Sequence, residues 1–268
     1  MADYDELNAL LAQMGGVVIG YSGGVDSALL AKAATDVLGK NAVCVLVESS
    51  LVPEVEIEDA ISTAEALGLN LVRLNVDALS MPHVSENAPD RCYHCKKSVF
   101  SAIAEIARQR GLSFILDGSN ANDESDYRPG SLAASELGVR SPFRELGFSK
   151  EQIRAVSREL GLVTWNKPSF ACLATRVPYG TTITAEILKR VEGAEDVMRQ
   201  LGFHQFRVRH HDDVARIELM PVEMERIMAP TMRAAVLGEL KSLGYAYVSL
   251  DLAGYRSGSM NETLDIAF

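Results

Sequence analysis

The chain has 268 residues, 47% of them hydrophobic, and a formal net charge of −10, a size that suits two domains and an apolar content that suits globular cores. The acidic balance speaks against non-specific binding to DNA or RNA. The sequence has no run of about 18 apolar residues and no basic leader, so we expect no membrane span and no signal peptide. Four cysteines do not make a disulfide scaffold, so the composition predicts a cytoplasmic protein with no nucleic-acid or membrane partner.

Short apolar segments alternate with helical patterns through the first part of the chain. Strands are expected at 17–19, 42–47, 71–76 and 114–116. Helices are expected at 4–14, 28–38, 54–67 and 96–110. This alternation predicts an α/β fold with a parallel, doubly wound sheet.

The pattern changes in the last third of the chain. Residues 130–162 are expected to form two helices, the second opened by a capping box of Ser149 and Gln152. Further on, the sequence predicts a helix at 184–201, helical structure at 221–243 with a break near Pro230, and strands at 205–210, 214–219 and 245–250. The expected domains are an α/β domain at 1–167, a linker and active-site loop at 168–182, and a smaller α+β domain at 183–268.

A glycine-containing loop separates the first strand from the helix that follows it. Adjacent Gly23 and Gly24 allow backbone N–H groups to converge, and the helix N-terminus adds positive potential. The loop lacks the Gly-Lys-Ser/Thr ending of a Walker A motif. The alternative is an ordinary tight turn, but the pattern favours a phosphate cradle formed by Ser22, Gly23, Gly24, Val25, Asp26 and Ser27.

Two more polar loops follow strand ends, where ligands bind in open α/β sheets. Ser49 follows the second strand, and residues 117–123 follow the fourth. Gly118 permits close backbone approach, and Asn120 and Asp123 are candidates for contacts with ribose, adenine or Mg²⁺, although a plain polar turn is the alternative. Arg128 is as easily a surface arginine as a contact for phosphate or carboxylate.

Three cysteines are candidate metal ligands. Cys92 and Cys95 form a CxxC motif expected just before a helix, and Cys172 lies in the proline-bounded loop. Three thiolates can hold three irons of a [4Fe–4S] cluster and leave the fourth iron open, whereas zinc would take His94 as a further ligand. A redox pair or unrelated surface thiols are the remaining alternatives, and Cys44 in an apolar strand is expected in the core.

Arginines form a second group of candidates. Arg207 and Arg209 alternate along an expected strand and so share one face, with Arg216 on the partner strand and Arg176 in the cysteine loop. Such a cluster on an acidic protein indicates a phosphate or carboxylate site, and a solvated basic face is the alternative.

The phosphate loop matches the SGGxDS signature of the PP-loop ATP pyrophosphatases, and the whole chain resembles the LarE family of that superfamily. The matching stretches are 21–27, 117–120, 126–130, 167–176 and 254–261. The resemblance implies a five-stranded parallel sheet with a smaller C-terminal α+β domain. It also implies an ATP-dependent sulfur transferase of nickel-pincer nucleotide synthesis, the cofactor pathway of lactate racemase.

The implied reaction adenylylates a carboxylate of pyridinium-3,5-biscarboxylic acid mononucleotide, releases pyrophosphate, and then replaces AMP by sulfur to give a thiocarboxylate. In one branch of the family the cysteine matching Cys172 gives up its own sulfur, whereas three-cysteine members resemble enzymes in which a [4Fe–4S] cluster carries the sulfide. This chain resembles the second branch, with sacrificial donation as the alternative. The implied cofactors are ATP, Mg²⁺ and the cluster.

The resemblance also assigns residues and partners. Catalytic residues would be Cys172 and Asp26, and the nucleotide would meet the phosphate loop, Ser49, Gly118 and Asn120. Substrate would be bound by Arg128, Arg176, Arg207 and Arg209, and cluster ligands would be Cys92, Cys95 and Cys172. A sulfide or persulfide donor and a homo-oligomeric assembly are expected.

Other functions of the superfamily are also open. A tRNA thiolase would share the ATP loop and the iron–sulfur chemistry, but the net charge of −10 speaks against an RNA substrate. An ammonia-using ligase such as NAD or GMP synthetase would leave the three cysteines without a role. A nucleotide-binding regulator would show no pyrophosphate release with candidate substrates.

Overall fold

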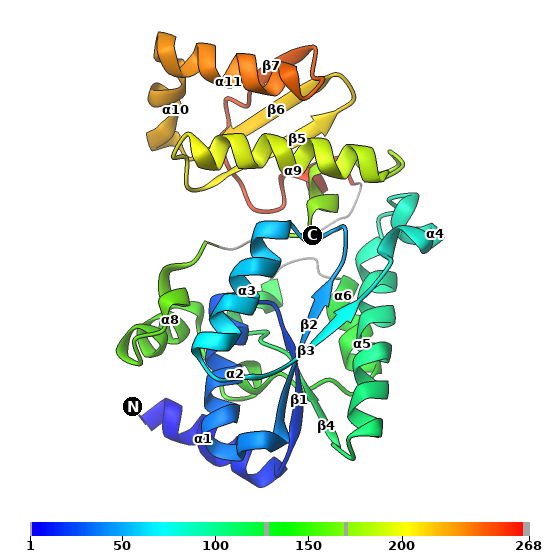
Figure 1. The fold of residues 1–268 in the computed structure, drawn as a ribbon, viewed down its shortest axis with the longest axis vertical. Helices are drawn as coiled ribbons and strands as arrows, with labels where there is room; N and C mark the ends of the chain where they lie inside the picture. The colour runs from blue at the N-terminus through cyan, green and yellow to red at the C-terminus, as the bar shows by residue number, and fades with distance from the viewer. Residues whose placement is uncertain (1, 126–128, 169–170, 265–268) are drawn as a thin grey trace. The chain divides into compact units, whose positions relative to one another are not determined.

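The computed structural model describes residues 2–125, 129–168 and 171–264 (Figure 1). It divides the chain into two compact units, Met1–Asp77 with Asp90–Phe170, and Ala78–Pro89 with Ala171–Phe268. None of the helices in the described ranges has the length and apolar character needed to cross a membrane.

The first unit is built on a parallel sheet with strand order β3-β2-β1-β4. Its strands are β1 Val17–Tyr21, β2 Ala42–Glu48, β3 Asn70–Asn75 and β4 Phe114–Leu116. The β-branched residues of β1 and β2 are almost fully buried, as expected for central parallel strands covered on both faces.

Among the described residues this sheet contains four strands, so the expected five-stranded sheet is wrong in its strand number. A single parallel bridge between Leu116 and Arg140 lies beyond β4, where a fifth strand would pair. Pro142 begins the short helix α7 (Pro142–Glu145) two residues later, and because proline cannot donate to a ladder, the extended pairing ends there.

Helices cover both faces of this sheet, which confirms the doubly wound architecture (Figure 1). They are α1 Ala2–Met14, α2 Val25–Leu38, α3 Glu54–Ala66, α5 Arg91–Gln109, α6 Pro129–Glu136 and α8 Lys150–Glu159. Val17 and Ile19 pack in a core with α1, α2 and α8, whereas Val18 packs with Phe100 and Ile103 of α5. Successive side chains of β1 thus serve opposite cores, because a strand alternates its faces.

The second unit has a three-stranded sheet with strand order β5-β6-β7. β5 Phe206–His211 and β6 Val214–Leu219 form an antiparallel hairpin, and β7 Tyr247–Leu250 pairs parallel to β6. The helices α9 Ala185–Gln200, α10 Pro221–Met228 and α11 Pro230–Ser242 complete the unit, with the predicted break at Pro230. The smaller α+β unit is therefore as expected.

One segment is placed differently from the expected domain limits. Residues 78–89, which the sequence assigned to the α/β domain, group with the second unit and include the one-turn helix α4 (Pro82–Ser85). The reason is hydrogen bonding: Ile183 N donates to Ser85 O at 2.7 Å, and the buried Asn87 side chain binds the carbonyls of Val177 and Pro178.

Short 3₁₀ helices occupy several of the connections. They are Gly39–Asn41, Ala78–Ser80, Ala121–Ser125, Val163–Asn166, Leu173–Arg176 and Ser259–Thr263. Two of them carry predicted functional segments, since Ala121–Ser125 follows Asn120 and Leu173–Arg176 follows Cys172.

Candidate active site

The phosphate loop connects the end of β1 to the first turn of α2. Gly23 has a φ of +71°, and a Cβ there would lie 2.5 Å from the Cβ of Ala60, so both conformation and space require glycine. The Ser27 hydroxyl closes the loop by accepting from Ser22 N at 3.1 Å and lies 3.1 Å from the Ser22 hydroxyl. The side chain of Val25 lies in the hydrophobic core and anchors the loop there. The arrangement fits a cradle for phosphate oxygens.

The loop after β4 lies directly against the phosphate loop, as the sequence predicts. A Cβ on Gly118 would lie 3.0 Å from Ser27 N and 3.2 Å from the Asp26 backbone carbon. The buried Asn120 side chain donates to Asp26 at 3.4 Å. Asp123 accepts from Asn120 N at 3.0 Å, so one part played by Asp123 is to shape this loop.

Lys150 is a site residue that the sequence analysis did not identify. Its ammonium group forms an ion pair with Asp26 in the phosphate loop. Lys150 is the first residue of α8, directly after the Ser149 cap, whose predicted capping box with Gln152 is confirmed. A cation is unfavourable at a helix N-terminus. The position of Lys150 at the start of an expected helix is therefore a sequence signal that could have indicated a functional lysine.

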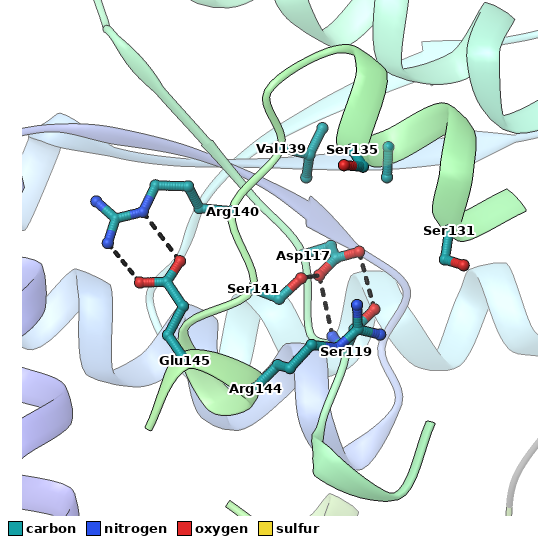
Figure 2. A pocket seen from close by; sticks show the side chains of 10 residues that line it. Asp117, Ser119, Ser131, Ser135, Val139, Arg140, Ser141, Arg144 and Glu145 are labelled. Carbon is teal, nitrogen blue, oxygen red and sulfur yellow. Dashed lines mark hydrogen bonds and ion pairs between the residues drawn. The ribbon is translucent and has the colours of Figure 1, made fainter. Parts of the chain in front are cut away.

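A polar pocket of about 230 Å³ adjoins the loop after β4 (Figure 2). Four serine hydroxyls line it, those of Ser119, Ser131, Ser135 and Ser141. Asp117 accepts hydrogen bonds from the Ser119 hydroxyl at 2.9 Å and from the Ser141 hydroxyl at 2.6 Å, so both of its carboxylate oxygens have a donor. An ion pair between Arg140 and Glu145 forms one side of the pocket.

The remaining nucleotide and substrate candidates of this unit are less informative. Ser49 directly follows β2, at the carboxyl edge of the sheet, and its carbonyl accepts from Val52 N in a turn. This places it at the same edge as the phosphate loop, where ligands of parallel sheets bind. Arg128 lies outside the described residues.

The CxxC motif was expected just before a helix, but it lies inside one. Helix α5 begins at Arg91, with Asp90 after Pro89 at its N-cap position, so Cys92 and Cys95 occupy its first turns. Residues three apart on a helix share a face, and both thiols are half-buried. Cys44 is buried in β2, where burial raises its thiol pKa to about 12, as expected for a core residue that is not a metal ligand.

The backbone of Cys172 is held firmly within the second unit. The residue is at the N-cap position of the 3₁₀ helix Leu173–Arg176, and its thiol is half-buried. Its carbonyl oxygen accepts from Thr175 N at 3.0 Å, from the Thr175 hydroxyl at 2.7 Å and from Arg176 at 3.2 Å.

Arg176 is buried and holds the cysteine loop, and its expected role in substrate binding stays a prediction. Its side chain is 0% exposed and makes two hydrogen bonds of 2.9 Å to Glu195 in α9. The same guanidinium donates to the carbonyls of Ala171 at 2.6 Å and Cys172. Glu195 also accepts from Val208 N, so the pair connects α9, β5 and the cysteine loop.

Arg207 and Arg209 do lie on alternate positions of β5, but both are buried, so a solvated basic face is wrong. Arg209 donates to Glu218 at 2.7 Å, Ser259 at 2.9 Å and Thr175 O at 2.9 Å. Its buried Nε has no hydrogen-bond partner within the described part of the chain. The Arg207 guanidinium stacks 5.1 Å from the Tyr255 ring, and burial together with the Arg176 charge lowers its pKa.

Arg176→Ala is expected to lower the free energy of unfolding by about 3–5 kcal/mol, because it leaves the buried Glu195 carboxylate without its cation. Urea unfolding of the metal-free protein measures this loss. Arg108→Ala is the matched control, since its pair with Glu105 is fully exposed and should contribute little. Equal, small losses for the two variants would contradict the buried-pair assignment.

Comparison with known proteins agrees with this geometry. The sequence profile of the NAD synthase family matches residues 6–121. An NH(3)-dependent NAD(+) synthetase of Archaeoglobus fulgidus is 32% identical over 46% of this chain and 47% of its own. Pyridinium-3,5-bisthiocarboxylic acid mononucleotide synthase of Lactiplantibacillus plantarum is 44% identical over 96% of this chain and 93% of its own. The chain therefore belongs to the family of that synthase, the LarE family within the PP-loop superfamily.

Proposed function

We propose that the protein uses ATP to activate a carboxylate of pyridinium-3,5-biscarboxylic acid mononucleotide and then converts it to a thiocarboxylate, for the nickel-pincer cofactor of lactate racemase. The observation that carries this proposal is the joined pair of loops, 22–27 and 117–120, in a chain that is 44% identical along 96% of its length to a synthase of this kind. The substrate is thus a small-molecule nucleotide.

In the first step a carboxylate oxygen of the substrate attacks the α-phosphorus of ATP. The bond between that phosphorus and the bridging oxygen breaks, and pyrophosphate leaves with the electron pair. Backbone N–H groups of the loop and the hydroxyls of Ser22 and Ser27 would hold the departing phosphates, and the Lys150 ammonium would stabilise their charge. Asp26 is the loop carboxylate that would hold Mg²⁺ with the nucleotide.

In the second step a sulfur nucleophile attacks the acyl carbon, a C–S bond forms, and AMP leaves. Cys172 in its fixed loop, with Cys92 and Cys95 on α5, supplies half-buried thiols of the type that holds a [4Fe–4S] cluster. When bound, the cluster would offer an open iron for a sulfide. Sacrificial donation of the Cys172 sulfur is the alternative, and it needs neither of the other two thiols.

The substrate phosphate is proposed to bind between Arg207 and Arg209. Burial and the Arg176 cation destabilise the charged form of Arg207, a condition that a phosphate would relieve. The buried Nε of Arg209 is an unused donor among the described residues, and an acceptor there would remove a desolvation penalty. The protein is further proposed to work in the cytoplasm as a homo-oligomer and to receive sulfur from a sulfide or persulfide donor.

Arg207→Gln is expected to weaken binding of the mononucleotide roughly tenfold to a hundredfold, the range of a charged hydrogen-bonding contact, and to leave ATP binding nearly unchanged. Calorimetric titration with each ligand measures the two affinities. Arg190→Gln is the matched control, because Arg190 also stacks on a tyrosine of this unit, at 5.5 Å from the Tyr245 ring. Equal losses for both ligands would indicate a folding defect instead.

The activity itself is tested by anaerobic incubation of the protein with ATP, Mg²⁺ and the dicarboxylate mononucleotide. AMP and pyrophosphate should form in equal amounts only when the mononucleotide is present, and mass spectrometry should find one oxygen replaced by sulfur. Pyrophosphate release that depends on ammonia and a different carboxylate, or on tRNA, would refute the assignment in favour of a ligase or a tRNA thiolase.

A further inference from the structure

The Asp26 carboxylate, proposed above as a ligand of Mg²⁺, already binds a cation of the chain itself. One of its oxygens forms an ion pair with the Lys150 ammonium, and the other accepts a hydrogen bond from the buried Asn120 amide at 3.4 Å. Among the described residues, neither Asp26 nor Lys150 has a second ionic partner. A metal ion that binds Asp26 must therefore compete with the Lys150 ammonium for the same carboxylate.

The backbone fixes the positions of both charges within the first unit. Asp26 lies in the first turn of α2, and Lys150 is the first residue of α8. The start of α8 is held by the capping box of Ser149 and Gln152 and by the Asn122 side chain, whose oxygen accepts from Lys150 N at 2.8 Å. The Asp26 and Lys150 side chains are only 22% and 32% exposed. Partial burial reduces screening by water, so this pair interacts more strongly than a fully exposed pair.

The surroundings of the pair favour more negative charge than one carboxylate supplies. Helices α2 and α8 both begin at the pair, and the N-terminus of a helix carries a partial positive charge. The Lys150 ammonium adds a full positive charge beside them. Because Asp26 contributes a single negative charge, a further anion such as a phosphate is attracted to this position, and Lys150 carries an ammonium that can bind it.

Binding of either ligand alone would leave one charge of the pair in an unfavourable position. If ATP binds without a metal and draws the Lys150 ammonium to its phosphates, the Asp26 carboxylate loses its partner and faces those phosphates as a like charge. If Mg²⁺ binds Asp26 without ATP, the Lys150 ammonium faces a divalent cation. When both ligands bind together, the carboxylate can bind the metal and the ammonium can bind phosphate, so every charge keeps an opposite partner.

We propose that Asp26 and Lys150 form an exchange pair that couples the binding of ATP to the binding of its metal. The ion pair opens only when both partners are replaced at once, so the site selects the complex of ATP with Mg²⁺ over either component alone. The inference rests on the nucleotide site of the proposed function, and it needs neither the mononucleotide nor the sulfur source.

The first test measures binding of ATP in the presence of a chelator, by calorimetric titration of the full-length protein. Asp26→Asn removes the like charge and frees Lys150, so it should bind metal-free ATP roughly tenfold more tightly than wild type, the size of one charge-assisted hydrogen bond. Lys150→Gln should bind metal-free ATP roughly tenfold more weakly. Asp36→Asn is the matched control, because Asp36 pairs with Lys32 at an exposed position of the same helix, and its ATP affinity should not change.

The second test measures metal binding without nucleotide, with Mn²⁺ as the probe and electron paramagnetic resonance as the readout. Lys150→Gln should bind Mn²⁺ roughly tenfold more tightly than wild type, because the competing ammonium is gone, and Asp26→Asn should lose that binding. Lys32→Gln is the matched control and should behave as wild type. Neither measurement depends on turnover, and the melting temperature of each variant reports its folding.

The two tests decide the exchange independently, so a variant that fails to fold leaves the other to decide. Folded Asp26→Asn protein that binds metal-free ATP no more tightly than wild type overturns the exchange, and so does folded Lys150→Gln protein that binds Mn²⁺ no more tightly. Wild-type protein that binds no ATP even with Mg²⁺ overturns the proposed nucleotide site together with the exchange. If wild-type protein binds ATP with Mg²⁺ but forms no thiocarboxylate, the proposed sulfur transfer fails and the exchange is still decided by the two affinities.

Discussion

Asp26→Ala protein is expected to fold normally and to form AMP and pyrophosphate at least about a hundredfold more slowly than wild type. Asp26 lies in the first turn of α2, next to the loop glycines, and contacts both Lys150 and Asn120. Removing its carboxylate takes away the proposed Mg²⁺ ligand and also the group that orients the Lys150 ammonium. Both losses reduce stabilisation of the departing pyrophosphate.

The measurement is AMP formation under saturating ATP and mononucleotide, with the melting temperature recorded for each protein. Asp36→Ala is the matched control, since Asp36 is an aspartate of the same helix that pairs with Lys32 at an exposed position. Ser27→Ala should be impaired as well, because the Ser27 hydroxyl closes the loop on Ser22 N. A folded Asp26→Ala protein with normal AMP formation would remove the phosphate-cradle assignment.

The loop that carries this prediction could be found from the sequence because its signals are local. Gly23 must adopt a positive φ against Ala60, and no other residue type does so without strain and a clash. The conformations of the strand before the loop and of the helix after it are determined by residues close to them in sequence. The same holds for the hairpin at 206–219 and for the capping box at Ser149.

Features that depend on distant partners could not be predicted. The sequence indicates that Arg176, Arg207 and Arg209 share a region, but not that Arg176 forms a buried ion pair with Glu195. Lys150 lies far from Asp26 in sequence, and only the folded sheet brings them together. The segment 78–89 looked like part of the first domain because chain order was the only guide, whereas Asn87 connects it to residues beyond Cys172.

The second large effect concerns the three cysteines, for which the two sulfur sources predict different sets of inactive variants. If a cluster carries the sulfide, alanine at Cys92, Cys95 or Cys172 should each remove iron and thiocarboxylate together, because a cluster loses a ligand in every case. If Cys172 donates its own sulfur, only Cys172→Ala should be inactive, and Cys92 and Cys95 should be dispensable. In both cases the Cys172→Ala protein should still release pyrophosphate, since the adenylylation loops are intact.

We expect the pattern of the cluster route, in which all three cysteine variants lose iron and thiocarboxylate together. Each variant is purified without oxygen, iron per chain and thiocarboxylate per chain are measured, and the peptide containing Cys172 is weighed after turnover. Cys44→Ala is the control, because Cys44 is a neutral thiol buried in β2 and its loss should leave iron and product unchanged. Colourless wild-type protein that makes one product per chain, and whose Cys172 has lost the mass of H₂S to become dehydroalanine, would establish the sacrificial route and leave Cys92 and Cys95 without a part in sulfur transfer.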